Sequence, residues 1–362
     1  MRLLLVDLGR EYRGGQHQAL LLLQGLRERG HVPELITVAN SVLASRAIEA
    51  GVAVHAVDSG MRRLAAAWTI HSLVRERRVD LVHANEPHAL SAAWLARAHR
   101  HTPLVLSRRL TLPIASGYFS QARYRAAARI IAVSHCVEQA IVRSGLPADR
   151  VLVIYDGVEI PPEISQTERE GARNLLGISQ QARCIGNVAA FSQEKGHALL
   201  LEAFARVRAQ FPEGLLVLRG DGPELPKAKQ LAEQLGLIDA VKFLPTTVDL
   251  RTAFAAMDIF AFPSREEALG TALLAAMAHG LPVAATARGG IPEVLTDRKN
   301  GLLVNDYDPE KFAAALSRLL ADSEGASRLG KAARETIAAR FSANRMVDET
   351  LHLYELVVAG DQ

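Results

Sequence analysis

The sequence predicts an α/β protein built from two tandem, Rossmann-like, doubly wound domains that face each other across a cleft. Short apolar runs without polar alternation recur between longer helical stretches, which is typical of parallel strands covered on both faces. This alternation runs through the first half of the chain and starts again after residue 180. With 362 residues, the chain is long enough for two domains of ordinary size.

The first half reads as a series of strands separated by helices. Its predicted strands are Arg2–Val6, Glu34–Val38, Val52–Val57, Asp80–Ala84, Leu104–Ser107, Ile130–Val133 and Val151–Ile154. Helical stretches such as Gln16–Arg29 and Met61–Arg77 lie between them. Strand–helix–strand alternation of this kind indicates a parallel sheet with right-handed crossovers.

The second half repeats the plan, and its predicted elements are the strands Cys184–Ala189, Leu215–Arg219, Val241–Leu244, Ile259–Phe262, Pro282–Ala285 and Gly301–Val304 and the helices Ala198–Gln210, Pro226–Leu235 and Pro309–Leu320. The stretch Asp156–Thr167 contains one glycine and two prolines, and it is the best linker candidate. We therefore expect one domain over residues 1–157 and another over 158–341. An amphipathic helix over Ser342–Val358, or about 342–360, ends the chain, and its apolar spacing fits packing on either domain.

Composition points to an ordinary globular protein in a reducing compartment, with 49% hydrophobic and 22% charged residues. The two cysteines, Cys136 and Cys184, are far apart, and they provide neither a disulfide framework nor zinc spacing. The apolar run at the N-terminus is too short for a signal peptide. The uncharged stretch 268–287 is interrupted by histidine, glycine and proline, so a helix, a turn and a buried strand explain it better than a membrane span.

Charge is distributed unevenly along the chain. Residues 1–155 contain 20 arginines, no lysine and 11 acidic residues, a net charge of +9, whereas the remainder carries −6. One interpretation is that the first half meets an anionic partner, such as an anionic membrane surface. The other is that arginine is simply the preferred cation of this chain. No nucleic-acid partner is expected.

Glycines follow the first predicted strand. The run Arg13-Gly14-Gly15-Gln16 opens the first helix, where backbone amides can approach an anion, although a plain strand-to-helix turn has the same appearance. The dinucleotide signature G-x-G-x-x-G is absent, so a nicotinamide dehydrogenase loses its main support.

Three loops of the second half also follow predicted strands, at the sheet edge where open α/β sheets bind ligands. Lys195 lies in the first loop and could neutralise a diphosphate. The second loop is the tight turn Gly220-Asp221-Gly222-Pro223. The third brings Glu267 close to Gly270-Thr271 at the start of a helix, where free amides favour anions. Each loop taken alone also fits a structural role.

Other patterns do not predict metal sites or nucleophiles, although His83 and His88 could line a cleft. Asp306 and Asp308 resemble a metal-binding acid pair, but Asp308-Pro309 reads as a helix cap followed by proline at the first helical position. His83 and His88 have no third metal ligand at suitable spacing. His135 and Cys136 are neighbours in sequence, and neighbouring side chains usually point apart.

Taken together, these residues resemble the family 4 glycosyltransferases of the GT-B fold over nearly the whole chain. The motifs that carry the resemblance are Gly14-Gly15, Arg29-Gly30-His31, Asp80-Leu81-Val82-His83, Ile131-Ala132-Val133-Ser134, Ile154-Tyr155-Asp156-Gly157-Val158, Glu194-Lys195-Gly196, Gly220-Asp221-Gly222-Pro223-Glu224, Pro263-Ser264, Gly280-Leu281-Pro282-Val283 and Gly289-Gly290-Ile291-Pro292-Glu293. Their number and order are much more specific than any single motif.

The resemblance implies transfer of a sugar from a nucleoside diphosphate to a saccharide or lipid-linked acceptor, with retention of configuration and without a metal or other cofactor. It implies that the second domain holds the donor, that the first holds the acceptor and that the last helix crosses back to the first domain. It also implies catalytic roles for Lys195 and Glu267. Implied donor-binding residues are Gly14, Gly15, Asn187, Lys195, Gly220, Gly222, Glu267, Leu269, Gly270, Thr271 and Ala275, and implied acceptor-side residues are His83, Glu86, His88, Arg108 and Arg109.

The chain departs from the family pattern at three places. Asn187 stands where a Gly-Arg pair is usual, Ser107-Arg108-Arg109 replaces a frequent histidine, and Ala275 stands where a second glutamate normally accepts hydrogen bonds from the ribose. Two rival functions therefore stay open: a nucleotide-sugar epimerase on the same plan, and a binding or regulatory protein with an impaired donor site. For the enzyme we expect a role in cell-envelope polysaccharide synthesis and a cytoplasmic location, peripheral on the inner face of the membrane.

Overall fold

The computed structural model describes residues 1–76 and 78–360. The chain divides into two compact units, the first comprising Met1–Gly157 together with the described residues from Ala343 onward, and the second comprising Val158–Ser342. Both are α/β units with a parallel sheet, so the predicted fold class of two doubly wound domains is confirmed.

The sheet of the first unit has the order β3-β2-β1-β4-β5-β6-β7, and every pair of neighbouring strands is parallel. Its strands are β1 (Arg2–Asp7), β2 (Val32–Val38), β3 (Ala53–Val57), β4 (Leu81–Ala84), β5 (Leu104–Arg108), β6 (Arg129–Ala132) and β7 (Val151–Val153). The strand order reverses between β1 and β4, and the carboxyl ends of these two strands flank the crevice where a doubly wound sheet binds ligands.

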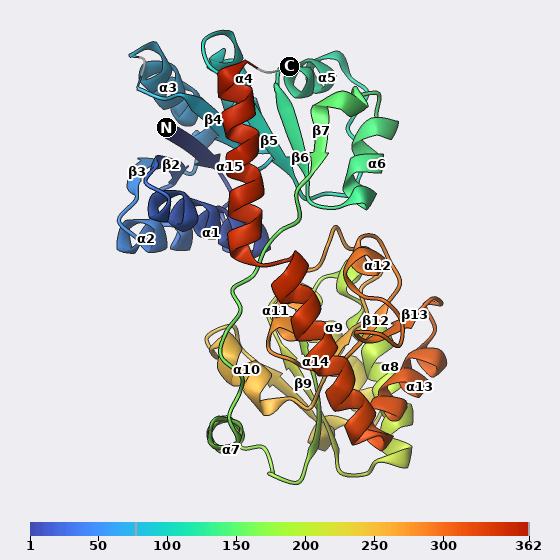
Figure 1. Cartoon of the computed structure of the whole chain (residues 1–362). Coiled ribbons are helices and arrows are strands. Elements are labelled where there is room, and N and C mark those ends of the chain that lie inside the picture. Colours follow the sequence, from blue (N-terminus) through green and yellow to red (C-terminus); the bar gives the residue numbers. More distant parts are fainter. Residues whose placement is uncertain (77, 361–362) are drawn as a thin grey trace. The chain divides into compact units, whose positions relative to one another are not determined.

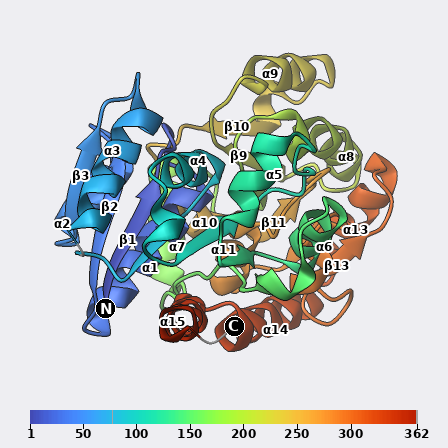
Figure 2. The same ribbon diagram turned by 90° about the horizontal axis from the view of Figure 1, so that it is seen from above.

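Helices cover both faces of this sheet (Figures 1 and 2). They are α1 (Gly14–Glu28), α2 (Val42–Glu49), α3 (Arg62–Arg75), α4 (Pro87–Leu95), α5 (Tyr118–Arg125), α6 (His135–Arg143) and α15 (Ala343–Ala359). Serine side chains cap α2 and α6, where Ser41 and Ser134 accept backbone N–H groups of the first turn. Arg77, predicted as the last residue of the helix that begins near Met61, lies outside the described residues.

Helix α15 belongs to the first unit although its sequence follows the second. Figure 1 shows it beside α1, and Met346, Val347 and Leu353 are buried in the core that α1 forms on one face of the sheet. Tyr354 is fully buried, and its hydroxyl contacts Nδ1 of His83 on β4. This polar contact fixes the position of α15 along the central strands.

The sheet of the second unit has the order β10-β9-β8-β11-β12-β13, again with only parallel pairs. Its strands are β8 (Arg183–Val188), β9 (Gly214–Arg219), β10 (Val241–Leu244), β11 (Ile259–Phe262), β12 (Val283–Thr286) and β13 (Leu302–Val304). The order reverses between β8 and β11, so the equivalent crevice of this unit lies at the carboxyl ends of those strands.

The helices of the second unit are α7 (Gln166–Leu176), α8 (His197–Gln210), α9 (Leu225–Gln234), α10 (Leu250–Ala256), α11 (Thr271–Ala278), α12 (Ile291–Val294), α13 (Pro309–Ala321) and α14 (Ser323–Arg340). One large core joins α8, α9 and α13 to a face of the sheet, while α14 packs against α11. The uncharged stretch 268–287 forms α11, a turn and β12, as predicted. Within the described residues, no helix is long and apolar enough to cross a membrane.

Candidate active site

Lys195 and Glu267 meet at the carboxyl edge of the second sheet. Lys195 ends the short 3-10 turn Gln193–Lys195 after β8, and Glu267 lies in the loop after β11. The Nζ atom of Lys195 lies 2.6 Å from Oε2 of Glu267, and both side chains are largely sheltered from solvent, with 22% and 13% of their surface exposed. A cation and a carboxylate are therefore held together at the point where the strand order reverses.

Glycine at position 196 allows the two loops to approach. Its φ is +71°, and a Cβ atom built there would lie 2.1 Å from the carbonyl oxygen of Pro263. The amide of Arg265 donates to the carbonyl of Glu194 over 2.7 Å and joins the same two loops. The resemblance motif Glu194-Lys195-Gly196 therefore has a steric explanation, because a side chain at 196 would separate Lys195 from Glu267.

The paired glycines 289 and 290 support the Glu267 loop from the other side. A Cβ atom at Gly289 would lie 1.9 Å from the Glu267 carbonyl oxygen, and the Gly290 amide donates to that oxygen over 2.9 Å. Gly270 has φ +98° and caps α11, and Thr271 is the first residue of that helix. The first-turn amides of α11, which have no partners within the helix, thus begin four residues after Glu267.

The other residues predicted to bind the donor make packing contacts or backbone hydrogen bonds within the second unit. Gly220 and Gly222 pack directly on the loop after β8, since Cβ atoms there would lie 1.9 Å from the Ala189 carbonyl oxygen and 2.5 Å from that of Phe191. Leu269 is buried. Ala275 is partly buried in the second turn of α11, where its carbonyl accepts a hydrogen bond from Nδ1 of His279 over 2.8 Å.

Asn187 lies within β8 and is 1% exposed, so the structure does not place it in the loop that carries Lys195. Its side-chain nitrogen donates to the Ala261 carbonyl on β11 over 2.8 Å. Its Oδ1 atom has no hydrogen-bond partner among the described residues. Asn187 therefore joins the two central strands. The positive charge beside a ligand at the loop would come from Lys195.

The first unit holds a polar network at its own strand-order reversal. Asp7 ends β1, and its carboxylate accepts hydrogen bonds from Asn85 over 2.7 Å and from Gln16 over 3.0 Å. Asn85 also donates to the carbonyl of Gly15 over 3.1 Å. Gly14 and Gly15 form the first turn of α1, whose amides lack helical partners, so the network fixes an anion-compatible helix terminus.

Arg109 is the cation of this network. Its Nε atom donates to Asp156 over 2.9 Å, and its Nη1 atom donates to the side chain and carbonyl of Asn85. Burial raises the pKa of Asp156, and the Arg109 guanidinium opposes that effect. Arg108 turns away, because consecutive residues of a strand point to opposite faces, and it donates to the hydroxyl of Tyr124 over 2.7 Å. Only Arg109 of the two therefore joins the site.

The other residues predicted for the acceptor side differ in their exposure to solvent. Glu86 caps α4 by accepting the amides of His88 and Ala89, and burial raises its pKa. His88 is exposed and contacts Arg63 over 2.7 Å. His83 is buried between Tyr354 and Ser107, with both ring nitrogens in hydrogen bonds, so the structure places it in the core rather than at the surface.

The sequence analysis missed Asp7, Asn85 and the pairing of Asp156 with Arg109. Asp7 ends β1 and Asn85 directly follows β4, and a position at the carboxyl end of a strand is also what pointed to the loops of Lys195 and Glu267. Asp308 caps α13 as predicted, and Asp306 pairs with Lys311. Within the described part of the chain, no three His, Cys, Asp or Glu side chains are grouped so as to hold a metal ion.

Comparisons with known proteins identify relatives of this chain. Residues 12–160 match the family model described as Glycosyltransferase Family 4, and residues 168–336 match the one described as Glycosyl transferases group 1. The D-inositol 3-phosphate glycosyltransferase of Corynebacterium urealyticum is 32% identical, over 76% of this chain and 71% of that protein. The lipopolysaccharide core biosynthesis glycosyltransferase LpsE of Rhizobium meliloti is 34% identical, over 50% of this chain and 52% of LpsE.

Among solved structures, that of HepE from Anabaena, in complex with UDP and glucose, superposes with a TM-score of 0.85 at 23% identity, covering 98% of this chain and 99% of HepE. This likeness shows the fold. The match to the Corynebacterium protein is long and similar enough to show the family. The chain belongs to the family 4 glycosyltransferases and has the GT-B fold.

Proposed function

We propose that this glycosyltransferase moves a sugar from a nucleoside diphosphate to a saccharide or lipid-linked acceptor, with retention of configuration and without a metal ion. The observation that carries the proposal is the Lys195–Glu267 pair at the strand-order reversal of the second sheet. HepE, with the same fold, was solved with UDP and glucose, which supports a nucleotide-sugar donor.

The diphosphate of the donor would occupy the Lys195 side of this pair. As the sugar leaves, negative charge grows on the diphosphate, and positive groups fixed in advance lower the barrier most effectively. The Lys195 ammonium and the first-turn amides of α11 supply such charge on rigid elements. Glu267 would orient the lysine and accept hydrogen bonds from hydroxyl groups of the donor sugar. Because Lys195 and the helix amides supply positive charge, a metal ion would not be required.

The acceptor would use the first unit. Asn85 joins Arg109 to the carbonyl of Gly15 there, at the first turn of α1, which suits an acceptor that carries hydroxyl groups beside a negative charge. Relatives named for inositol phosphate and for the lipopolysaccharide core support a polar, saccharide-like acceptor.

Association with an anionic membrane surface forms part of the proposal. Helices α3, α4 and α5 are neighbours in the first unit (Figures 1 and 2), and they expose Trp68, Tyr118 and Phe119 by 75%, 81% and 72%. Exposed aromatic residues enter the lipid interface, and neighbouring arginines attract anionic headgroups. Helices α3, α4 and α5 contain five arginines and no acidic residue, so this surface is suited to negatively charged lipid.

A direct test incubates the full chain with a panel of UDP-, GDP- and ADP-sugars and follows release of the nucleoside diphosphate, with and without a chelator. The anomeric configuration of the product is then read by NMR. The proposal fails if no donor is consumed with any phosphorylated polyol or lipopolysaccharide fragment as acceptor, or if turnover requires a metal. An inverted product would overturn the part that concerns stereochemistry. Ala275 favours the second candidate, a protein with an impaired donor site, and nucleotide binding without turnover would support it.

A further inference from the structure

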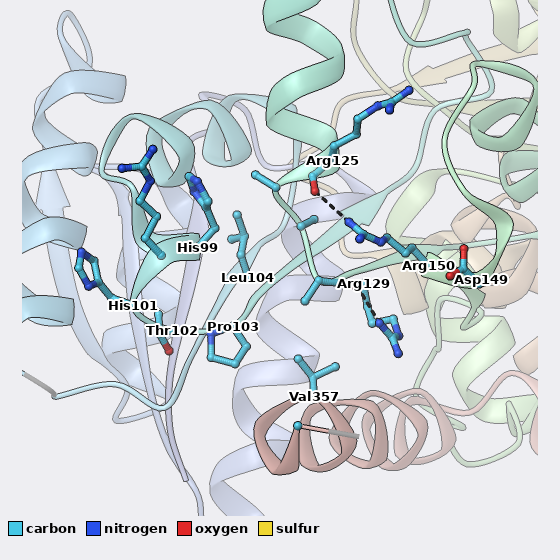
Figure 3. A pocket seen from close by; sticks show the side chains of 15 residues that line it. His99, His101, Thr102, Pro103, Leu104, Arg125, Arg129, Asp149, Arg150 and Val357 are labelled. Carbon is cyan, nitrogen blue, oxygen red and sulfur yellow. Dashed lines mark hydrogen bonds between the residues drawn. The ribbon is translucent and has the colours of Figure 1, made fainter. Parts of the chain in front are cut away.

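A basic hollow lies at the opposite edge of the first sheet, where β5 and β6 begin. It has a volume of about 540 Å³, within the range of small-molecule sites. Its lining comes from the loop before β5, the residues that join α5 to β6, the turn before β7 and the last turns of α15 (Figure 3). The site proposed above is at the carboxyl ends of the strands, so this hollow is separate from it.

Four arginines line the hollow: Arg100, Arg125, Arg129 and Arg150. Three of them donate to backbone carbonyls, since Arg125 contacts Gly145, Arg129 contacts Ala128 and Arg150 contacts the carbonyl of Arg125. Among the described residues, none of the four forms an ion pair with a carboxylate. One acidic residue, the exposed Asp149, is part of the lining.

Two histidines also line the hollow. His99 and His101 flank Arg100 in sequence, before β5. Both histidines are labelled in Figure 3. The Nδ1 atom of His99 is buried and has no hydrogen-bond partner within the described part of the chain. Burial, together with the positive charges of Arg100 and His101, lowers the pKa of His99. Arg100 and His101 thus add positive charge beside His99.

We propose that this hollow binds a phosphate group, carried either by a lipid headgroup or by a soluble phosphate ester. Guanidinium groups suit phosphate because their planar N–H forks match its oxygen atoms. Arginines that line one hollow without carboxylate partners repel one another, and a bound dianion would reduce that repulsion. Because Val357 and Gly360 also line the hollow, a ligand there would contact the last turns of α15.

The test compares the full chain with a variant in which Arg129→Gln and Arg150→Gln remove two charges from the hollow. A second variant, Arg100→Gln, changes an exposed side chain, so its effect is independent of folding. The matched control is Arg27→Gln, because Arg27 is also exposed in the first unit and also donates to a carbonyl, that of Ala50. Calorimetry with glycerol 3-phosphate measures the soluble source, and flotation of phosphatidylcholine vesicles with and without phosphatidic acid measures the lipid source.

We expect the double variant to bind at least about tenfold more weakly than the unmodified chain and the Arg27→Gln control, since each contact to phosphate is charge-assisted. A loss confined to vesicles identifies the lipid headgroup, and a loss confined to calorimetry identifies a soluble ester. The proposal is overturned if the double variant and Arg100→Gln match the unmodified chain in both assays, or if Arg27→Gln loses as much.

Discussion

The Nζ atom of Lys195 lies 2.6 Å from Oε2 of Glu267, and 71 residues of chain separate the two in sequence. Gly196 allows this approach because its missing side chain lets the loop lie on the carbonyl of Pro263. Each residue of the pair holds the other at the mouth of the sheet. Removing either one should therefore affect donor binding through the partner that stays behind.

Lys195→Ala should weaken donor binding by roughly ten- to a hundredfold while the fold is kept, because a charge-assisted contact contributes roughly 1.5–3 kcal/mol. Glu267 would then face the diphosphate without its cation. In the double variant with Glu267→Ala, part of the lost affinity should return because the unpaired carboxylate is gone. Titration with nucleoside diphosphates measures both effects.

Lys227→Ala is the control, because Lys227 pairs with Glu224 over 2.8 Å on the exposed side of α9. It should bind donor as the unmodified chain does. Equal affinity for nucleoside diphosphates in Lys195→Ala and the unmodified chain would remove Lys195 from the site.

Much of the fold could be predicted, because buried parallel strands leave a local signal in apolar runs. Strands β10 and β11 were predicted with the bounds that the structure gives, and every other predicted strand overlaps an observed one. Helix α7 was not predicted, since its sequence is strongly polar and its buried residues are Ala172 and Arg173. Its position depends on packing against α10 and on the ion pair of Arg173 with Asp258.

The site was harder to predict than the fold. Lys195, Glu267 and Gly270 could be chosen because they follow strands, but their mutual distances depend on glycines whose role is steric. His83 lies near the carboxyl end of β4, where a ligand-binding residue would be expected. The structure instead pairs it in the core with Tyr354, which is 271 residues away in sequence. Contacts between such distant residues cannot be inferred from local patterns.

Acid should destabilise both units through buried histidines. Burial, with a smaller effect of Arg109, lowers the pKa of His83 to about 3, and burial, with Lys195, lowers that of His197 to about 4. Because the unfolded chain has the ordinary value of 6.5, it binds more protons than the folded chain below that pH. Stability is therefore unaffected above about pH 6.5 and falls as the pH decreases toward each folded value. At pH 5 each histidine should cost about 2 kcal/mol relative to pH 7.

His197→Phe tests this effect, since His197 stacks on Phe191 with ring centroids 4.0 Å apart and a phenyl ring can keep that contact. Urea unfolding at pH 7 and pH 5 should show a smaller loss of stability in the variant. His352→Gln, at an exposed position of α15, should keep the full pH dependence. An identical pH dependence in all three proteins would show that His197 is not the titrating group.

The exposed aromatic residues of α3 and α5 should anchor the chain to anionic vesicles. In the variant Trp68→Ala with Tyr118→Ala and Phe119→Ala, partition to phosphatidylglycerol vesicles should fall at least about tenfold, because each aromatic side chain contributes roughly 1.5–3 kcal/mol when fully buried. High salt should weaken binding of the unmodified chain as the arginine attraction is screened. Ile48→Ala removes an apolar side chain of α2 that is 62% exposed and should have no effect. Flotation that is the same for the triple variant and the unmodified chain would contradict the assignment of this surface.

Ala275→Glu should tighten donor binding. Position 275 lies in the second turn of α11, eight residues after Glu267, and it is partly exposed. If the ribose lies beside this turn, a glutamate there would accept hydrogen bonds from its hydroxyl groups. Each such bond to a carboxylate contributes roughly 1.5–3 kcal/mol, and two bonds to one group do not simply add. We expect the donor dissociation constant to fall at least about tenfold.

The control is Ala272→Glu, which adds the same charge to a partly exposed alanine one turn earlier in α11. It should not improve binding, since charge alone repels the diphosphate. Without ligand, Ala275→Glu should also lower thermal stability slightly, because the carboxylate loses hydration that only the ribose replaces. Titration of nucleoside diphosphate into the three proteins separates these effects. If Ala275→Glu binds no more tightly than the unmodified chain, the ribose lies elsewhere, and another residue of the second unit holds it.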